Sequence, residues 1–439
     1  MRHSAFSQLH TIYGWHDDQR KGRSISLINT LVTSIYNVFI TGIFYTGFLT
    51  IYDISLVEIG IITFISPLAN CFVIFSPFIL ERIKKRKWIL ASSKIFYYLL
   101  IIVATNLMPY FVTDPGARVV WFCVLQFSAS AVYAIFSTGF TPWFYSFYPD
   151  NPEQRSAYIS YNQVFSSILS SATLLLTGTL SSLIENSGHQ SELIIGLRYF
   201  AFLLVLIDVF FQVQAKEYPY PVHSGKIKFR EIFTLPPKHH KFFLCMILTF
   251  VWTYIVYLNT GIWNYYILNT VGLSIKEVNF ASALYVVYMF LFIPFWRKLV
   301  NRMGWIKTFA LGVMLWWPTE IYFFFLTPVT KQLYLPGIIV QHFISVGLNL
   351  SYANIPFLNL PRENTTTHTC FHAFFCNVFA FLGLMTSTFW CSLFGEETVL
   401  YLGTVPTTAV QYTTLMRAFL MLILSIILLR KWRDFMPDN

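Results

Sequence analysis

Apolar stretches of roughly 20 to 30 residues follow one another along most of the chain, and short polar segments separate them. An α-helix of about 20 apolar residues spans the hydrocarbon core of a bilayer. The pattern therefore predicts an all-α polytopic membrane protein. We place twelve transmembrane helices near residues 27–50, 57–79, 88–111, 119–147, 156–184, 193–215, 241–268, 278–296, 306–327, 333–357, 368–394 and 411–430.

The two halves of this pattern resemble each other in sequence. "TGIFYTGFLTIYDISLVEIG" matches "TGIWNYYILNTVGLSIKEVN" and pairs Ser55 with Ser274 and Glu58 with Glu277. An internal repeat indicates a duplicated structural unit, so we predict two pseudo-symmetric halves of six helices each. The predicted organisation is an N-terminal arm at 1–24, a first half at 25–215, a linker at 216–240, a second half at 241–430 and a tail at 431–439.

Composition supports a membrane location. Hydrophobic residues make up 56% of the chain and charged residues only 11%, whereas a soluble domain carries about 25% charged residues. Most of the surface must therefore contact membrane lipids. The formal net charge of +10 is spread over many loops rather than gathered in one soluble domain, so we do not expect nucleic acid as a partner.

Basic residues are divided unevenly between alternate loops. Of the 30 Lys and Arg, 24 lie at the termini and in one set of loops, whereas 4, including Arg198, lie in the other set. Because short basic loops stay on the cytoplasmic side, we expect both termini to be cytoplasmic. We expect a monomer that crosses the plasma or inner membrane of the cell many times.

The basic loops after the second and eighth helices carry related motifs. The first, "ERIKKRK", contains Glu81 and Arg82, and the second, "NRMGWIK", contains Arg302 and Gly304. With twelve spans in a six-plus-six repeat, these motifs resemble the G-x-x-x-D-R-x-G-R-R/K loop of the major facilitator superfamily of secondary transporters. Both copies depart from that pattern: the first lacks the glycines, and the second has Asn301 in place of the acid.

The resemblance implies a transporter that works by alternating access, with this loop as a cytoplasmic gate. It assigns gating to Glu81, Arg82 and Arg302. We place Arg155 with them. Its segment "PEQRSAY" is echoed by "PRENTTT" in the second half, a further sign of the repeat. The alternative, that these residues only determine topology, stays open, and the two roles are compatible.

The resemblance also implies a central cavity lined by the first, second, fourth, fifth, seventh, eighth, tenth and eleventh helices. Their mid-span polar residues are mainly amides, accompanied by Tyr and Trp, and their only titratable groups besides Tyr and Cys are histidines. Amides offer paired hydrogen-bond donors and acceptors, and aromatic rings offer flat apolar faces. We therefore predict a substrate site made from Asn37, Gln126, Asn162, Gln163, Asn259, Trp263, Asn264, Tyr266, Tyr288, Asn349 and Asn377.

The densest group of these residues lies in "NTGIWNYYILNT" on the seventh helix. Asn259, Trp263 and Tyr266 follow an i, i+4, i+7 spacing and share one helix face. Asn264 lies about 100° around the helix from Trp263. The alternative for any single amide is that it joins helices to each other.

Four charged residues lie inside apolar spans, on helices that the resemblance places behind the cavity. At 1.5 Å per residue, Lys94 and Asp208 lie about 9 to 10 Å from one membrane face, and Glu320 and Arg417 lie at a similar depth from the other. Because a lone charge in the membrane is costly, we predict structural ion pairs between Lys94 and Asp208 and between Glu320 and Arg417. A substrate or proton role is the alternative.

Energy coupling needs a titratable group if a proton drives transport. His342 and His372 are the candidates on cavity helices, and a packing role is the alternative for each. A coupling proton or cation and passive facilitation both stay open. The chain has no phosphate-binding G-x-x-x-x-G-K-[ST] loop and no H-E-x-x-H motif, so we expect no cofactor, no bound metal and no enzymatic activity.

Two transport functions fit these residues. The amides and the scarcity of charge favour a small neutral polar solute, such as a sugar, a glycoside or a nucleoside-like molecule. The 45 Phe, 26 Tyr and 12 Trp fit export of an amphipathic compound, such as a drug, a lipid-like molecule or a peptide natural product. A membrane-embedded enzyme or sensor is a minor alternative. We favour the neutral polar solute.

Overall fold

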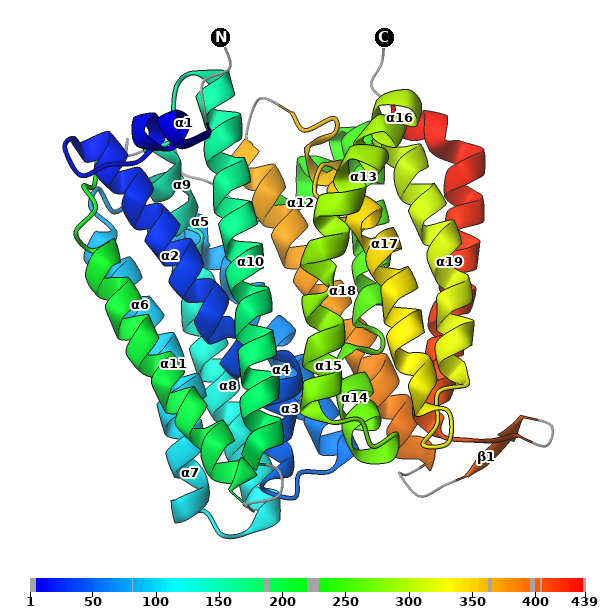
Figure 1. Ribbon diagram of the computed structural model, residues 1–439. Coiled ribbons are helices and arrows are strands. Elements are labelled where there is room, and N and C mark those ends of the chain that lie inside the picture. The colour runs from blue at the N-terminus through cyan, green and yellow to red at the C-terminus, as the bar shows by residue number, and fades with distance from the viewer. Residues whose placement is uncertain are drawn as a thin grey trace. The chain divides into compact units, whose positions relative to one another are not determined.

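The structure is a computed structural model in which nearly the whole chain forms helices (Figure 1). One short two-stranded sheet is also present among the described residues. Glu81, a candidate gating residue, lies outside the described part of the chain. The described residues are 5–80, 82–184, 189–218, 229–361, 365–394, 399–402 and 405–436.

Most spans of the first half are assembled from two or three helical segments. These are α2 (Asp18–Ile40) with α3 (Gly42–Thr50), α4 (Leu56–Asn70) with η1 (Cys71–Phe75) and α5 (Ser76–Leu80), α6 (Lys87–Tyr98) with η2 (Leu99–Ala104) and α7 (Thr105–Phe111), α8 (Pro115–Ser137) with α9 (Phe140–Tyr145), α10 (Pro152–Ile184), and α11 (Gln190–Gln212). The segmentation interrupts the backbone hydrogen-bond ladder within several spans.

The second half is built in the same way. Its spans are α13 (His240–Tyr257) with α14 (Thr260–Tyr265) and η5 (Tyr266–Thr270), α15 (Ile275–Ala283) with α16 (Tyr285–Phe324), η6 (Lys331–Leu333) with α17 (Tyr334–Tyr352) and η7 (Ile355–Phe357), α18 (Thr365–Phe394), and α19 (Ala409–Lys431). Outside the spans lie α1 (Ala5–Ile12), α12 (Phe229–Thr234), η4 (Pro236–Lys238) and η8 (Trp432–Phe435).

A β-hairpin that the sequence pattern did not predict precedes α19. Its strands are β1 (Leu400–Leu402) and β2 (Val405–Thr407), which pair antiparallel with Leu400 opposite Thr407. The Thr407 hydroxyl also donates a hydrogen bond to the Leu400 carbonyl at 2.9 Å.

Eleven helical stretches among the described residues are long and apolar enough to cross a membrane. One of them, Ile275–Phe324, has 50 residues, which corresponds to about 75 Å of helix and is too long for one crossing. Gly304 divides it, with φ 78° and ψ 170°, a conformation that glycine adopts readily. The stretch therefore supplies two crossings, and the twelve predicted spans are confirmed.

The first span begins earlier than predicted. We placed its start near residue 27, but α2 begins at Asp18. Asp17 caps this helix, because its side chain accepts a hydrogen bond from the Arg20 backbone N–H at 2.7 Å. The polar first turns of α2 therefore belong to the helix, although their composition resembles that of a loop.

The chain divides into two compact units. Unit 1 comprises Met1–Phe48 and Phe72–Ile227, and unit 2 comprises Leu49–Cys71 and Lys228–Asn439. Within unit 1, α2 packs on α10 and α11, and α6 packs on α8 and α11 (Figure 1). Within unit 2, α16 packs on α17 and α19, and α13 packs on α18.

The second span contributes α4 to unit 2, where it packs on α14 and α18. Two glycines permit this approach. A Cβ on Gly60 would lie 2.3 Å from the Thr388 hydroxyl oxygen, and a Cβ on Gly261 would lie 3.1 Å from the Thr63 methyl carbon. Small residues at such positions let helix backbones approach closely.

The internal repeat is visible in the local structure. At the start of α4, the Ser55 N–H and hydroxyl both donate to Glu58 Oε2, at 2.9 and 2.8 Å. At the start of α15, Ser274 and Glu277 form the same capping box at 2.8 and 2.9 Å. The residues paired by the sequence alignment therefore occupy equivalent helix N-termini.

Gly383 sets the approach of α18 to α13. A Cβ at this position would lie 2.6 Å from the Tyr254 carbonyl oxygen. Because a backbone atom cannot move aside as a side chain does, Gly383→Val should lower the free energy of unfolding by about 1–3 kcal/mol. Thermal unfolding of the purified protein measures this loss. Gly196→Val is the control, since a Cβ at Gly196 meets no atom within 4 Å, and an equal loss in both variants would contradict the argument.

Candidate functional site

In unit 1, a buried ion pair joins α6 to α11. Lys94 Nζ lies 2.6 Å from Asp208 Oδ2, and the Asp208 side chain is 0% exposed. Asn29 Nδ2 on α2 donates a hydrogen bond to Asp208 Oδ1 at 2.7 Å, and the Tyr36 hydroxyl, also on α2, donates to Oδ2 at 3.5 Å. The structure thus brings the two predicted partners together, and both carboxylate oxygens accept hydrogen bonds.

Tyrosine rings lie close to this pair. Tyr36 meets Tyr98 edge to face with 5.1 Å between ring centroids, and Tyr97 stacks on Tyr133 at 4.6 Å. Tyr36 lies on the first span and Tyr133 on the fourth, which the family resemblance places at the cavity. The pair was expected behind the cavity, but Asn29 and Tyr36 connect it directly to the first span.

Unit 2 contains the second predicted pair, between α16 and α19. Arg417 Nη2 lies 3.4 Å from Glu320 Oε1. The same oxygen accepts a hydrogen bond from Trp316 Nε1 at 2.7 Å and from Gln341 Nε2 on α17 at 3.4 Å. The Glu320 charge is therefore shared between one cation and two neutral donors.

Arg198 does not lie where the sequence pattern placed it. We counted it with the outer loops, although the predicted span 193–215 already contains it. In the structure α11 begins at Gln190, so Arg198 lies about two turns inside the helix. It is 0% exposed. The assignment to a loop is therefore wrong, and unit 1 contains a buried cation in addition to Lys94.

The third span supplies hydrogen-bond acceptors for this guanidinium. Arg198 Nη2 donates to the Ile101 carbonyl at 2.6 Å and to the Thr105 hydroxyl at 2.9 Å, and Nε donates to Asn106 Oδ1 at 2.8 Å. Ile101 lies in η2, a π-helix, and π-turns often occur at functional or specialised sites. The guanidinium carbon also lies 3.8 Å from the centroid of the Phe48 ring, a cation–π contact.

The seventh span is broken between α13 and α14, at Leu258 and Asn259. Asn259 is 1% exposed, and its Oδ1 accepts a hydrogen bond from the Thr413 hydroxyl on α19 at 2.8 Å. Tyr266 is 2% exposed and donates its hydroxyl to the Leu326 carbonyl at 2.6 Å. These hydrogen bonds connect the seventh span to α19 and to the segment after α16, so both residues fit the packing alternative, and substrate contact stays a prediction.

Trp263 lies on the same helix face. Its ring is 5.5 Å from that of Tyr266 and 5.7 Å from that of Phe323, measured between centroids. Asn264 lies on another face and is partly exposed, as is Asn37 in unit 1. Among the four predicted residues of the seventh span, Asn264 is therefore the strongest remaining candidate for substrate contact.

A polar and aromatic cluster joins α16 to α17 in unit 2. We define the Tyr285 cluster as Tyr285, Tyr288, His342 and Asn349. The His342 ring lies 5.5 Å from the Tyr285 ring and 6.1 Å from the Tyr288 ring, and Asn349 Nδ2 donates to the Tyr285 hydroxyl at 3.1 Å. His342 Nε2 lies 2.7 Å from the Ala281 carbonyl oxygen. Because a carbonyl only accepts, Nε2 carries a proton.

His372 belongs to a second polar group, between α13 and α18. Its Nε2 lies 3.1 Å from the Thr249 hydroxyl and 3.2 Å from Cys376 Sγ. Thr249 donates its own proton to the Met246 carbonyl at 2.7 Å, so His372 Nε2 is the donor to Thr249. In the described part of the chain, neither His342 nor His372 forms an ion pair with a carboxylate.

The remaining predicted amides are bonded locally or exposed. Asn162 and Asn377 each donate to the carbonyl four residues earlier, at 3.0 and 2.8 Å. Gln126 Nε2 donates to the Ser130 hydroxyl at 3.5 Å, and Gln163 is exposed. An amide with one local bond keeps further hydrogen-bonding capacity, and its substrate role stays a prediction.

The candidate gating arginines are exposed or bonded locally. Arg82 and Arg302 are exposed. Arg155 Nε donates to the Pro149 carbonyl at 3.0 Å, and its guanidinium carbon lies 5.7 Å from the centroid of the Tyr145 ring. The gating role stays a prediction for all three.

Glu217, which the sequence analysis did not single out, binds the first basic loop. Its Oε1 accepts hydrogen bonds from the backbone N–H groups of Arg86 and, at 3.0 Å, of Lys87. The first N–H groups of a helix have no hydrogen-bond acceptor within the helix, and the Glu217 carboxylate accepts from them at the start of α6. Its negative charge also interacts favourably with the helix dipole. Lys216 bonds to Asp18, and this hydrogen bond raises the pKa of Lys216. No local sequence signal marks Glu217, because its partners lie about 130 positions away.

Comparison with known proteins agrees with this architecture. A family model described as MFS/sugar transport protein matches residues 24–429. The chain belongs to this family of the major facilitator superfamily. The fold class and the transporter class predicted from the sequence are therefore confirmed. No curated protein matches the chain, and no three metal-ligating side chains come together in the described ranges.

Solved structures of transporters share the fold. The nucleoside transporter NupG superposes with a TM-score of 0.64 at 13% identity, covering 95% of this chain and 99% of that one. A bacterial homologue of the iron transporter ferroportin in an inward-facing state gives 0.63 at 11% identity, covering 94% and 98%. A bacterial homologue of the human lysosomal transporter Spinster gives 0.58 at 13% identity, covering 96% and 97%. At these identities the likeness shows the fold alone.

Proposed function

We propose that this member of the family carries a small neutral polar solute, of the sugar, glycoside or nucleoside class, across a membrane. The observation that carries the proposal is the Tyr285 cluster. It offers the exposed amide of Asn349, the phenol rings of Tyr285 and Tyr288, and the imidazole of His342. The Nε2–H of this imidazole already donates a hydrogen bond to the Ala281 carbonyl. These groups suit a neutral ligand that has hydroxyls on one side and a flat apolar face on the other.

Two comparisons support this proposal at the level of the fold. The family description names sugar transport, and NupG is a nucleoside transporter. Alternating access between inward-facing and outward-facing states is typical of this architecture. From the distribution of Lys and Arg we expect both termini in the cytoplasm. His342 and His372 stay candidates for proton coupling.

The proposal is tested first by ligand binding. Purified protein is heated with panels of sugars, glycosides and nucleosides at millimolar concentration. A ligand present at 100 times its Kd stabilises the native state by about 2.7 kcal/mol, so a binder should raise the unfolding temperature. Shifts confined to a parallel panel of amphipathic drugs and lipids would instead support the alternative, export of an amphipathic compound.

Asn349→Ala should weaken the binding of the solute found in this way. One lost hydrogen bond contributes about 0.5–1.5 kcal/mol, so we expect an increase in Kd of up to about tenfold, with a matching loss of uptake into proteoliposomes. Asn269→Ala is the matched control, because Asn269 is an exposed amide bonded to its own helix at the Tyr265 carbonyl. An unchanged Kd in Asn349→Ala would remove the Tyr285 cluster from the binding site.

A further inference from the structure

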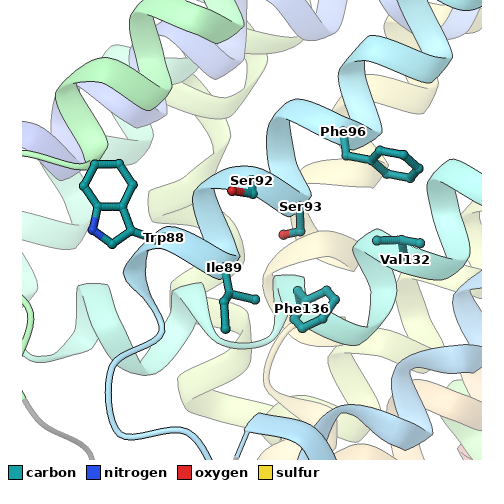
Figure 2. Close-up of a pocket in the computed structure, with 7 residues that line it drawn as sticks. All are labelled: Trp88, Ile89, Ser92, Ser93, Phe96, Val132 and Phe136. Carbon is teal, nitrogen blue, oxygen red and sulfur yellow. The ribbon is translucent and has the colours of Figure 1, made fainter.

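A crevice on unit 1 lies between α6 and α8. It has a volume of about 390 Å³. Figure 2 shows its lining, in which two serines are surrounded by apolar side chains. The lining residues are Trp88, Ile89, Ser92, Ser93, Phe96, Val132 and Phe136.

The lining changes in polarity along α6. Trp88, Ser92 and Phe96 are spaced by four residues and share one helix face. Trp88 is 69% exposed and Phe96 is 40% exposed, and Ser92 is also exposed. At 1.5 Å per residue, these side chains mark three levels about 6 Å apart. Trp prefers the membrane interface, so the Trp88 indole marks the interface end of this face. The Ser92 hydroxyl is then level with the ester region of a lipid leaflet, and the Phe96 ring with its acyl chains.

The basic loop lies directly before the Trp88 end of this face. Arg86 and Lys87 are turned inward: Glu217 binds their backbone N–H groups, and Lys87 Nζ donates to the Ala215 carbonyl at 3.1 Å. Arg86 is buried accordingly.

Three other cations of the loop, Arg82, Lys84 and Lys85, are exposed. They lie within six positions of Trp88 in the sequence. The crevice is therefore uncharged and mainly apolar, and the cations precede its Trp88 end in the sequence. This arrangement matches the charge distribution of an anionic amphipath.

We propose that this crevice binds one phospholipid with an anionic head group, taken from the leaflet on the basic side of the protein. The phosphate contacts Arg82, Lys84 and Lys85, and the Ser92 hydroxyl faces the ester region. One acyl chain lies along Phe96, Val132 and Phe136. Basic groups beside intramembrane helices recognise such head groups. This binding is separate from the solute site, and it depends on neither the solute nor the direction of transport.

The head-group contact is tested with delipidated, monodisperse protein and two synthetic lipids. Dioleoylphosphatidylglycerol and dioleoylphosphatidylcholine share their acyl chains and differ in charge. Native mass spectrometry should show preferential retention of phosphatidylglycerol. Because one basic residue near the surface changes affinity about fivefold, Lys84→Gln with Lys85→Gln should reduce this preference about 25-fold. Arg297→Gln with Lys298→Gln, at two other exposed basic positions, should leave it unchanged.

The crevice contact is tested by filling it. Two separate variants, Ser92→Phe and Val132→Trp, each place a ring in the crevice. Each should abolish retention of both phosphatidylglycerol and phosphatidylcholine. Leu203→Phe enlarges an exposed apolar position on α11 and serves as the control. The proposal would be overturned if the original protein retained the two lipids equally, or if both double variants lost the preference for phosphatidylglycerol to the same extent. It would also be overturned if Ser92→Phe and Val132→Trp both still retained lipid.

Discussion

Replacing Lys94 by methionine should destabilise the protein by about 3–5 kcal/mol, because it leaves the Asp208 carboxylate charged in a fully buried position. The hydrogen bonds from Asn29 and Tyr36 are neutral and cannot replace the lost cation. We expect a large fall in the unfolding temperature in detergent and a lower yield of folded protein. Asp208→Asn should act in the same direction, because it leaves the Lys94 ammonium without its carboxylate.

Removing both charges should restore most of the loss. A buried ion pair replaced by neutral side chains of similar volume is often as stable as the original, so Lys94→Met with Asp208→Asn should be more stable than either single variant. Lys276→Met, at an exposed position, is the control and should change stability by less than about 0.5 kcal/mol. A double variant less stable than both singles would falsify the structural role. A folded double variant that no longer transports would assign the pair a functional role.

Arg198→Met should cost about as much as the loss of Lys94. It removes the donor to Asn106 Oδ1 and one of two side-chain donors to the Ile101 carbonyl, which the Thr105 hydroxyl also binds. A buried acceptor left unsatisfied, here Asn106 Oδ1, costs about 1–3 kcal/mol. It also removes the cation–π contact with Phe48, which contributes up to about 2 kcal/mol when desolvated. Thermal unfolding measures the sum, for which we expect about 3–5 kcal/mol.

Arg198→Lys separates charge from shape. An ammonium keeps the charge but lacks the planar fork that reaches several acceptors at once, so this variant should lie between Arg198→Met and the original protein. If it matches the original, charge alone is sufficient and the geometry described for the guanidinium is irrelevant. If Arg198→Met is itself harmless, the hydrogen bonds to the third span do not contribute to stability.

The sequence predicted the spans because each apolar run, as an α-helix, is about as long as the hydrocarbon core of a bilayer is thick, or longer. It also predicted the partners of both ion pairs, because depth along a helix follows from residue counting, and Lys94 and Asp208 were assigned the same depth. Arg198 escaped this reasoning because we counted it with the neighbouring outer loop, although it lies five residues inside the predicted span 193–215.

Periodicity was less informative for the seventh span. Asn259, Trp263 and Tyr266 share a face, as the spacing predicts, and the rings of Trp263 and Tyr266 are in contact. Periodicity identifies residues that share a face, but it does not identify the neighbour that this face meets. In the structure, Asn259 binds Thr413 on α19, and only the packing of the whole unit could reveal that partner.

The junction at Gly304 has a mechanical consequence. Because the eighth and ninth spans meet at one residue with φ 78°, no slack chain separates them. Any tilt of one span must be absorbed by rotation about the two backbone dihedral angles of Gly304, or it is passed to the other span. A change in the angle between these two spans is therefore concentrated in the backbone of a single residue, which acts as a hinge.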